Sequence, residues 1–202
     1  QVMGCALLLR DILTKAGVPQ NLFAVVNADN DGVGQAINDK RIAAVTVTGS
    51  VRAGSAIAAL SGAAIKKCVL ELGGSDAFIV LADADIDAAV KGAIAGRFMN
   101  NGQLCISAKR IIVEAAVFEQ FSEKFVSAVK AMKIGDPREP GTWIGPMARY
   151  DLRDELDAQV QATLKEGATL LVGGHALPGE GNYYAPTVLS DVKPGMTSFD
   201  QE

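Results

Sequence analysis

Residues 42–71 read IAAVTVTGSVRAGSAIAALSGAAIKKCVLE, and the fold class can be predicted from this stretch. The β-branched run at 42–48 predicts a strand, because branched side chains pack well on a pleated sheet. Residues 50–64 predict a helix that begins directly after Gly49, and residues 67–70 predict a second strand. A strand, a helix and a strand at this spacing form a βαβ unit with parallel strands. The fold class is therefore α/β, with a parallel sheet.

The alternation of helices and strands continues on both sides of this unit. Further helices are predicted at residues 2–16, 33–38, 83–100, 117–132 and 149–166. Further strands are predicted at residues 22–26, 77–81, 110–114 and 168–172. One face of the 117–132 helix carries a stripe of apolar side chains that we expect in the core: Phe118, Phe121, Phe125 and Val129.

The composition limits the possible functions. The chain has 202 residues, of which 49% are hydrophobic, which suffices for one large domain or parts of two. A net charge of −4 and a pI near 5.1 argue against nucleic acid as a partner. No apolar run reaches the roughly 18 residues of a membrane span, and no signal-peptide pattern opens the chain. It begins within a predicted helix and stops without a terminating feature, so we expect it to be cut at both ends.

The three cysteines are too few and too scattered for a disulfide framework or a zinc site. Cys5 and Cys68 stand among small and apolar residues, and both are interpreted as core residues. Unpaired thiols fit a reducing compartment, for which the cytoplasm is the default. No metal is predicted, because helix capping explains the acidic run of Asp83, Asp85 and Asp87 at a helix start.

Three places in the sequence are candidates for chemistry. Gly49 and Ser50 join a strand to a helix, where exposed N–H groups suit a pyrophosphate, although an ordinary capped helix explains them too. Glu71 precedes a Gly-Gly turn and is either an exposed strand end or a general base. Cys105 lies in a loop whose backbone N–H groups and amides would stabilise an oxyanion, and it is either a nucleophile or an inert thiol. His175, in a Gly-Gly-His turn, is expected to be exposed rather than paired with a cysteine.

Two segments make the chemical interpretation specific. Residues 71–87, ELGGSDAFIVLADADID, and residues 98–110, FMNNGQLCISAKR, resemble the aldehyde dehydrogenase family. The resemblance implies that Cys105 attacks an aldehyde to give a thiohemiacetal, that a hydride passes to NAD or NADP to leave a thioester, and that Glu71 activates water to hydrolyse it. It also implies a cofactor site formed by Gly49, Ser50 and the backbone of Leu72. Glu202 resembles a family glutamate that holds the nicotinamide ribose, because residues 198–202 resemble the approach to a Glu-x-Phe-Gly-Pro motif.

The resemblance covers the whole chain, although family chains are more than twice as long. It implies that residues 1–72 are the C-terminal half of an NAD(P)-binding domain and that residues 73–202 are most of a catalytic domain, truncated. It also implies a homo-oligomer, a dimer or a tetramer, for the full-length chain. A small-molecule aldehyde is the expected partner.

Three phrases resemble the bacterial succinate-semialdehyde dehydrogenases within this family: residues 27–32, 44–54 and 66–71. Several family members that act on semialdehydes have an arginine six residues before the cysteine, where this chain has Met99. A broad-specificity aldehyde dehydrogenase is therefore an alternative. Two further alternatives are a non-catalytic fragment and an acylating or esterase activity of the same cysteine.

Overall fold

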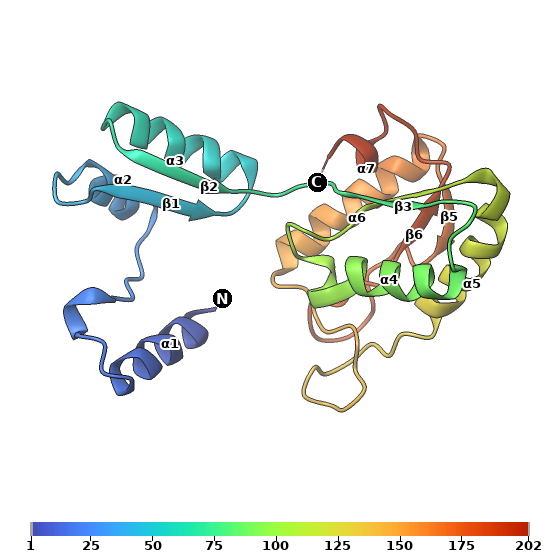
Figure 1. Cartoon of the computed structure of the whole chain (residues 1–202), viewed down its shortest axis with the longest axis horizontal. Coiled ribbons are helices and arrows are strands. Elements are labelled where there is room, and N and C mark those ends of the chain that lie inside the picture. The colour runs from blue at the N-terminus through green and yellow to red at the C-terminus, as the bar shows by residue number, and fades with distance from the viewer. Residues whose placement is uncertain (1, 202) are drawn as a thin grey trace. The chain divides into compact units, whose positions relative to one another are not determined.

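The computed structural model describes residues 2–201 and divides the chain into two compact units, Gln1–Leu72 and Gly73–Glu202. Each unit is described by itself (Figure 1). The α/β class is confirmed, because each unit contains a pair of parallel strands joined through a helix. That the units are the cofactor-binding and catalytic parts of an enzyme stays a prediction.

The first unit is built around the predicted βαβ motif. Its elements in chain order are α1 (Met3–Lys15), the 3₁₀ helix η1 (Gln20–Leu22), α2 (Asn30–Asn38), β1 (Ala44–Thr48), α3 (Val51–Ala63) and β2 (Lys67–Glu71). The strands β1 and β2 pair in parallel from Ala44 opposite Lys67 to Thr48 opposite Glu71. In Figure 1 the helix α3 runs along this pair, so the turn before α3 lies at the carboxyl end of the strands.

Two expectations for the first unit are wrong. Residues 22–26 form no strand, because a strand exists only by pairing and no described segment pairs with them. Cys5 is exposed rather than buried, since it lies on α1, whose apolar residues Leu8 and Ile12 are also exposed. Cys68 is partly buried in β2.

The second unit continues the α/β pattern and ends in a hairpin-like pair. Its elements are β3 (Ala77–Val80), α4 (Ile86–Phe98), η2 (Met99–Gly102), β4 (Arg110–Val113), η3 (Ala115–Val117), α5 (Phe118–Lys130), α6 (Tyr150–Lys165), β5 (Thr169–Val172), β6 (Val188–Ser190) and α7 (Thr197–Asp200). The strands β3 and β4 are parallel, whereas β5 and β6 are antiparallel. The prediction missed β6 and α7, since three or four residues carry too little periodicity to be recognised.

The core of the second unit lies between β3, α4 and α5. Phe121 stacks on Phe125 with ring centroids 5.5 Å apart, and Phe98 of α4 contacts Phe125 at 6.3 Å. The apolar stripe on α5 is confirmed for Phe121, Phe125 and Val129, which are buried, but Phe118 is 45% exposed. Phe118 is the first residue of α5, and the preceding turn of η3 does not cover it.

None of the described helices is long and apolar enough to cross a membrane. The helix α4 begins with the cap that its acidic residues predict, because the Asp85 carboxylate accepts the Ala88 N–H at 3.0 Å. Asp87, in the first turn of α4, pairs with Lys124 of α5. Hydrogen bonding and charge attraction from Lys124 lower the pKa of Asp87.

Candidate active site

Glu71 lies directly beside the turn that was predicted to bind a pyrophosphate. It is the last residue of β2, and its backbone carbonyl accepts the Gly49 N–H at 3.0 Å. The parallel register causes this neighbourhood, because Thr48 at the end of β1 stands opposite Glu71. The Glu71 side chain is exposed. One end of one small sheet therefore presents both a carboxylate and a strand-to-helix turn.

The turn itself is a capped helix start, in which Gly49 and Ser50 are both exposed. Ser50 caps α3, because its hydroxyl oxygen accepts the Ala53 N–H at 3.2 Å. A methyl group built at Gly49 would lie 3.7 Å from the Ala53 Cβ, an ordinary contact. The fold of this unit therefore does not itself require glycine at position 49. The exposed turn fits a bound phosphate at the helix N-terminus.

Leu72 follows Glu71 and packs over α3. A methyl group built at Gly54 would lie 2.5 Å from Leu72 Cδ2 and 2.9 Å from Leu72 Cδ1. Gly54 is buried, so its lack of a side chain is what allows the leucine to approach the helix. The Leu72 side chain therefore packs against α3 at a position that any larger residue at 54 would obstruct.

The cysteine loop leaves α4 through a sharp left-handed kink. Asn100 has φ 51° and Asn101 has φ 58°, a region that few residues other than glycine and asparagine adopt. Gly102 follows with φ 72°, and a Cβ there would lie 2.9 Å from the Arg97 guanidinium. Arg97 Nη1 donates to the Gly102 carbonyl at 3.2 Å, and burial lowers the pKa of Arg97. Cys105 lies three residues farther on and is exposed.

Two amide side chains of this loop reach a distant part of the chain. Asn101 Nδ2 donates to the carbonyls of Gly145 and Pro146, at 2.8 Å and 2.9 Å, and Asn101 Oδ1 accepts the Gly145 N–H at 3.0 Å. Gln103 Oε1 accepts the Ala148 N–H at 3.0 Å. The Asn101 amide is therefore fully engaged with Gly145 and Pro146. Gln103 uses its oxygen for Ala148 and donates from Nε2 to the Asn100 carbonyl at 3.2 Å. That amides and N–H groups of the loop stabilise an oxyanion stays a prediction.

The backbone after Leu72 is held close to the cysteine by two cations. Lys109 Nζ donates to the Gly74 carbonyl, and Arg110 donates from Nε and Nη2 to the Ser75 carbonyl at 3.0 Å and 2.8 Å. A Cβ built at Gly74 would lie 3.3 Å from the Cys105 carbonyl oxygen. Sequence reasoning missed these contacts, because a backbone carbonyl 35 residues away leaves no pattern in the sequence.

Two further candidates lie apart from these segments in the sequence. His175 is exposed, as predicted, and its Nδ1 lies 3.0 Å from the Gly173 carbonyl oxygen. Glu202 lies outside the described residues, so its assignment to the nicotinamide ribose stays a prediction. Within residues 2–201, no group of three or more His, Cys, Asp or Glu side chains is placed to hold a metal ion.

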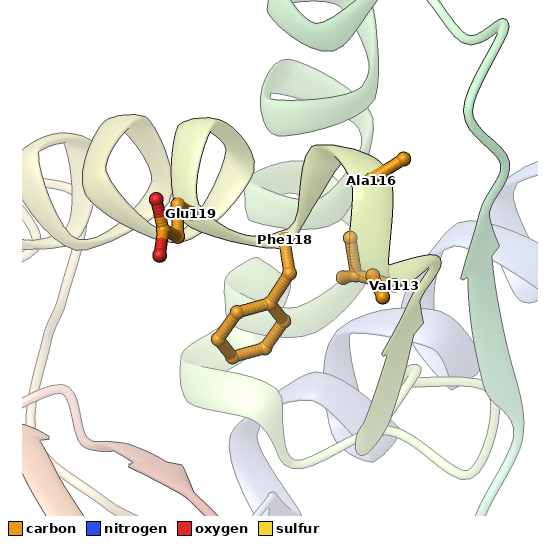
Figure 2. A pocket seen from close by; sticks show the side chains of 5 residues that line it. Val113, Ala116, Phe118 and Glu119 are labelled. Carbon is orange, nitrogen blue, oxygen red and sulfur yellow. The ribbon is translucent and has the colours of Figure 1, made fainter.

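A surface hollow at the start of α5 carries no comparable chemistry. Figure 2 shows Phe118 and Glu119 extending from α5 in different directions, with Val113 and Ala116 beside them. Ala115 completes the lining, so the hollow contains a single carboxylate and no nucleophile.

Comparison with known proteins identifies the family of this chain. The model of the aldehyde dehydrogenase family matches residues 1–202, the whole chain. The chain belongs to the aldehyde dehydrogenase family. The NAD(P)+ succinate semialdehyde dehydrogenase Sad of Escherichia coli (strain K12) is 60% identical over 201 residues, which cover 100% of this chain and 44% of that protein. The NADP(+) succinate-semialdehyde dehydrogenase of Mycobacterium avium (strain 104) is 46% identical, over 98% of this chain and 42% of that protein.

Solved structures of the family have the same fold. The succinic semialdehyde dehydrogenase of Streptococcus pyogenes, determined in complex with NADP+ as the cofactor, superimposes with a TM-score of 0.93. It is 35% identical, over 98% of this chain and 43% of that one. The present aldehyde dehydrogenase chain thus spans less than half the length of the relatives that it matches.

Proposed function

We propose that the complete protein oxidises an aldehyde to its carboxylic acid with NAD+ or NADP+, through a covalent intermediate on Cys105. The observation that carries this proposal is the exposed Cys105 thiol at the end of a loop that is anchored on several sides. Membership of the family supports it. The printed activity of the E. coli and M. avium relatives supports succinate semialdehyde as the substrate.

The chain's own residues supply the covalent chemistry. The Cys105 thiolate attacks the aldehyde carbon, which forms an S–C bond and moves an electron pair onto the carbonyl oxygen. The donors that stabilise this oxygen are N–H groups of the loop other than the Asn101 amide, which is engaged with Gly145 and Pro146. Loss of a hydride from the carbon then leaves a thioester. Glu71 takes a proton from water, the hydroxide attacks the thioester, and the Cys105 thiolate leaves.

The cofactor site lies at the start of α3. Gly49 and Ser50 would hold the pyrophosphate, and the backbone of Leu72 would contact the nicotinamide part. Gly49 fits this assignment. A side chain at position 49 would occupy the space in front of the turn, although the first unit itself would accommodate it. When bound, NAD+ or NADP+ supplies the hydride acceptor that no side chain provides.

Two substitutions in the complete protein test the mechanism. Cys105→Ala should abolish aldehyde oxidation, while Cys5→Ala, which removes another exposed thiol, should leave the rate unchanged. Glu71→Gln should give a burst of about one equivalent of reduced cofactor and then slow turnover, because the thioester forms but is not hydrolysed. Stopped-flow absorbance of the reduced nicotinamide measures both the burst and the steady-state rate. Full steady-state activity of Glu71→Gln would refute the role of Glu71 as the base.

A second candidate, a broad-specificity aldehyde dehydrogenase, is favoured by Met99. This residue stands six positions before Cys105 and is 57% exposed, so it offers an aldehyde an apolar surface rather than a cation. The comparison of succinate semialdehyde with uncharged aldehydes of similar length separates the candidates. A preference of about tenfold in kcat/KM, about 1.4 kcal/mol in the transition state, supports a pocket that binds the carboxylate. Equal values support broad specificity.

The same proposal assigns a role to each unit, and a compartment and an oligomeric state to the complete protein. Residues 1–72 would be the C-terminal half of the NAD(P)-binding domain, and residues 73–202 the truncated catalytic domain. Three free cysteines suit a reducing compartment such as the cytoplasm. Size-exclusion chromatography of the complete protein tests the proposed dimer or tetramer.

A further inference from the structure

Asn101 makes three side-chain hydrogen bonds from the cysteine loop to a distant segment. Its amide group makes three bonds to Gly145 and Pro146, which lie 44 and 45 residues farther along the chain. Both of its amide protons and its oxygen are used. The side chain therefore closes a long loop at a point four residues before Cys105.

The backbone conformation of Asn101 also favours asparagine at this position. Its φ of 58° and ψ of 27° lie in the left-handed region, which asparagine adopts more readily than most residues with a side chain. A kink of this kind persists when surrounding contacts hold it. The three bonds of the Asn101 amide are such contacts, and they fix the direction in which the chain continues toward Cys105.

The partner segment is itself held in place. Its carbonyl at Met147 accepts from Asn182 Nδ2 at 3.3 Å, and the Met147 N–H donates to the Asn182 carbonyl at 2.9 Å. Ile144, next to Gly145, is buried in the core. Asn101 thus joins the cysteine loop to a segment that is anchored to the core of the second unit.

We propose that Asn101 is a positioning residue that locks the Cys105 loop onto residues 145–146 and thereby sets the orientation of the thiol for attack. The proposal rests on the proposed function in one respect, namely that Cys105 is the nucleophile. Asn101 itself touches neither substrate nor cofactor in this proposal. It acts through the three hydrogen bonds and the left-handed kink.

The test uses the complete protein with Asn101 replaced in two ways. Asn101→Gly retains access to the left-handed backbone but removes all three bonds. Asn101→Asp keeps the shape of the side chain but removes both N–H donors and sets a carboxylate against two carbonyls. We expect kcat to fall by about tenfold or more in both, with KM changed less than about threefold, because small misplacements of a reacting group mainly reduce the rate.

Hydrogen exchange separates a local lock from a general loss of stability. In Asn101→Gly the amides of residues 99–106 and 143–148 should exchange about tenfold faster, while those of α5 and β3 stay as slow as in the parent. Each kcat is measured well below the variant's own unfolding midpoint. The control is Asn182→Ala, which removes the side-chain bond to Met147 but retains the backbone bond between the two residues. Its kcat should stay within about twofold of the parent value.

Each result bears on the proposal. Faster exchange of residues 99–106 with an unchanged kcat would overturn it, as would equal losses of kcat in Asn182→Ala and Asn101→Gly. A uniform rise of exchange across the second unit would reduce Asn101 to a structural residue and overturn it too. If Cys105→Ala were fully active, the proposed function would fail, whereas the exchange data would still report whether the lock exists.

Discussion

At the scale of single residues, two glycines of the first unit differ in what they make possible. Gly54 lets Leu72 approach α3, because any side chain at position 54 would collide with the leucine at 2.5 Å. Gly49 has ordinary space around it, so its lack of a side chain matters only to a molecule bound in front of the turn. Gly54 is therefore required for packing, and we propose that Gly49 serves cofactor binding.

Replacing each glycine by alanine tests this distinction. Gly54→Ala gains about 1 kcal/mol of helix propensity but overpacks Leu72 at a cost of about 1–3 kcal/mol, so we expect a net loss of stability of up to about 2 kcal/mol. Gly49→Ala should leave the stability within about 0.5 kcal/mol and weaken the binding of NAD+ or NADP+. Urea unfolding and calorimetric titration measure the two effects. A destabilised Gly49→Ala with parental cofactor affinity would reverse the assignment.

At the scale of elements, α7 is attached to α6 by a carboxylate. Glu166, which directly follows α6, accepts the N–H and the hydroxyl of Thr197, both at 2.7 Å. The buried Thr163 adds a contact of 2.7 Å between its hydroxyl and that of Ser198. The hydrogen bonds from Thr197 lower the pKa of Glu166. A short helix that would not persist alone is thereby fixed.

The attachment of α7 should depend on pH. Because the pKa of Glu166 is lower in the folded state, its stabilising effect is complete above its ordinary pKa of 4.5 and is lost as the pH falls through the folded value. The exchange protection of residues 197–200, corrected for intrinsic rates, should therefore decrease from pH 5 downward. Glu166→Gln should be less protected at pH 7 and lose this dependence, whereas Glu180→Gln, an exposed carboxylate elsewhere, should retain it. An unchanged profile in Glu166→Gln would contradict this account.

At the scale of the whole molecule, the aromatic core belongs to one unit. Phe98, Phe121 and Phe125 all lie in the second unit, within the cluster that α4 and α5 form with β3. The first unit has a thinner interior, in which Ile37 is the buried large side chain among the described residues. The two units therefore have separate sources of stability.

Two phenylalanines of α5 provide a matched test of this division. Phe125→Ala should cost about 3–5 kcal/mol, because a buried ring leaves a cavity. Phe118→Ala, at the exposed start of the same helix, should cost about 0.5 kcal/mol. Hydrogen exchange of the chain should show that Phe125→Ala accelerates residues 73–201 and leaves residues 2–72 unchanged. Equal acceleration in both units would mean that they unfold as one.

Much of the fold was predictable because local patterns determine it. The β-branched run before Gly49, the serine that caps α3 and the aspartate that caps α4 all act within a few residues, so their consequences can be predicted. Family resemblance added the roles of Cys105 and Glu71, which stay predictions about chemistry. The strand expected at 22–26 is absent because its composition suits a strand but no segment within residues 2–201 pairs with it.

The α/β class and the βαβ unit at residues 42–71 follow from the sequence alone, whereas the register that places Glu71 opposite Thr48 came from the structure. Only the tertiary structure decided that Asn101 bonds Gly145 and Pro146, and that Arg110 bonds Ser75. The physical reason is that these bonds end on backbone carbonyls. Every residue carries such a carbonyl, so the sequence offers nothing to distinguish the one that the folded chain brings within reach.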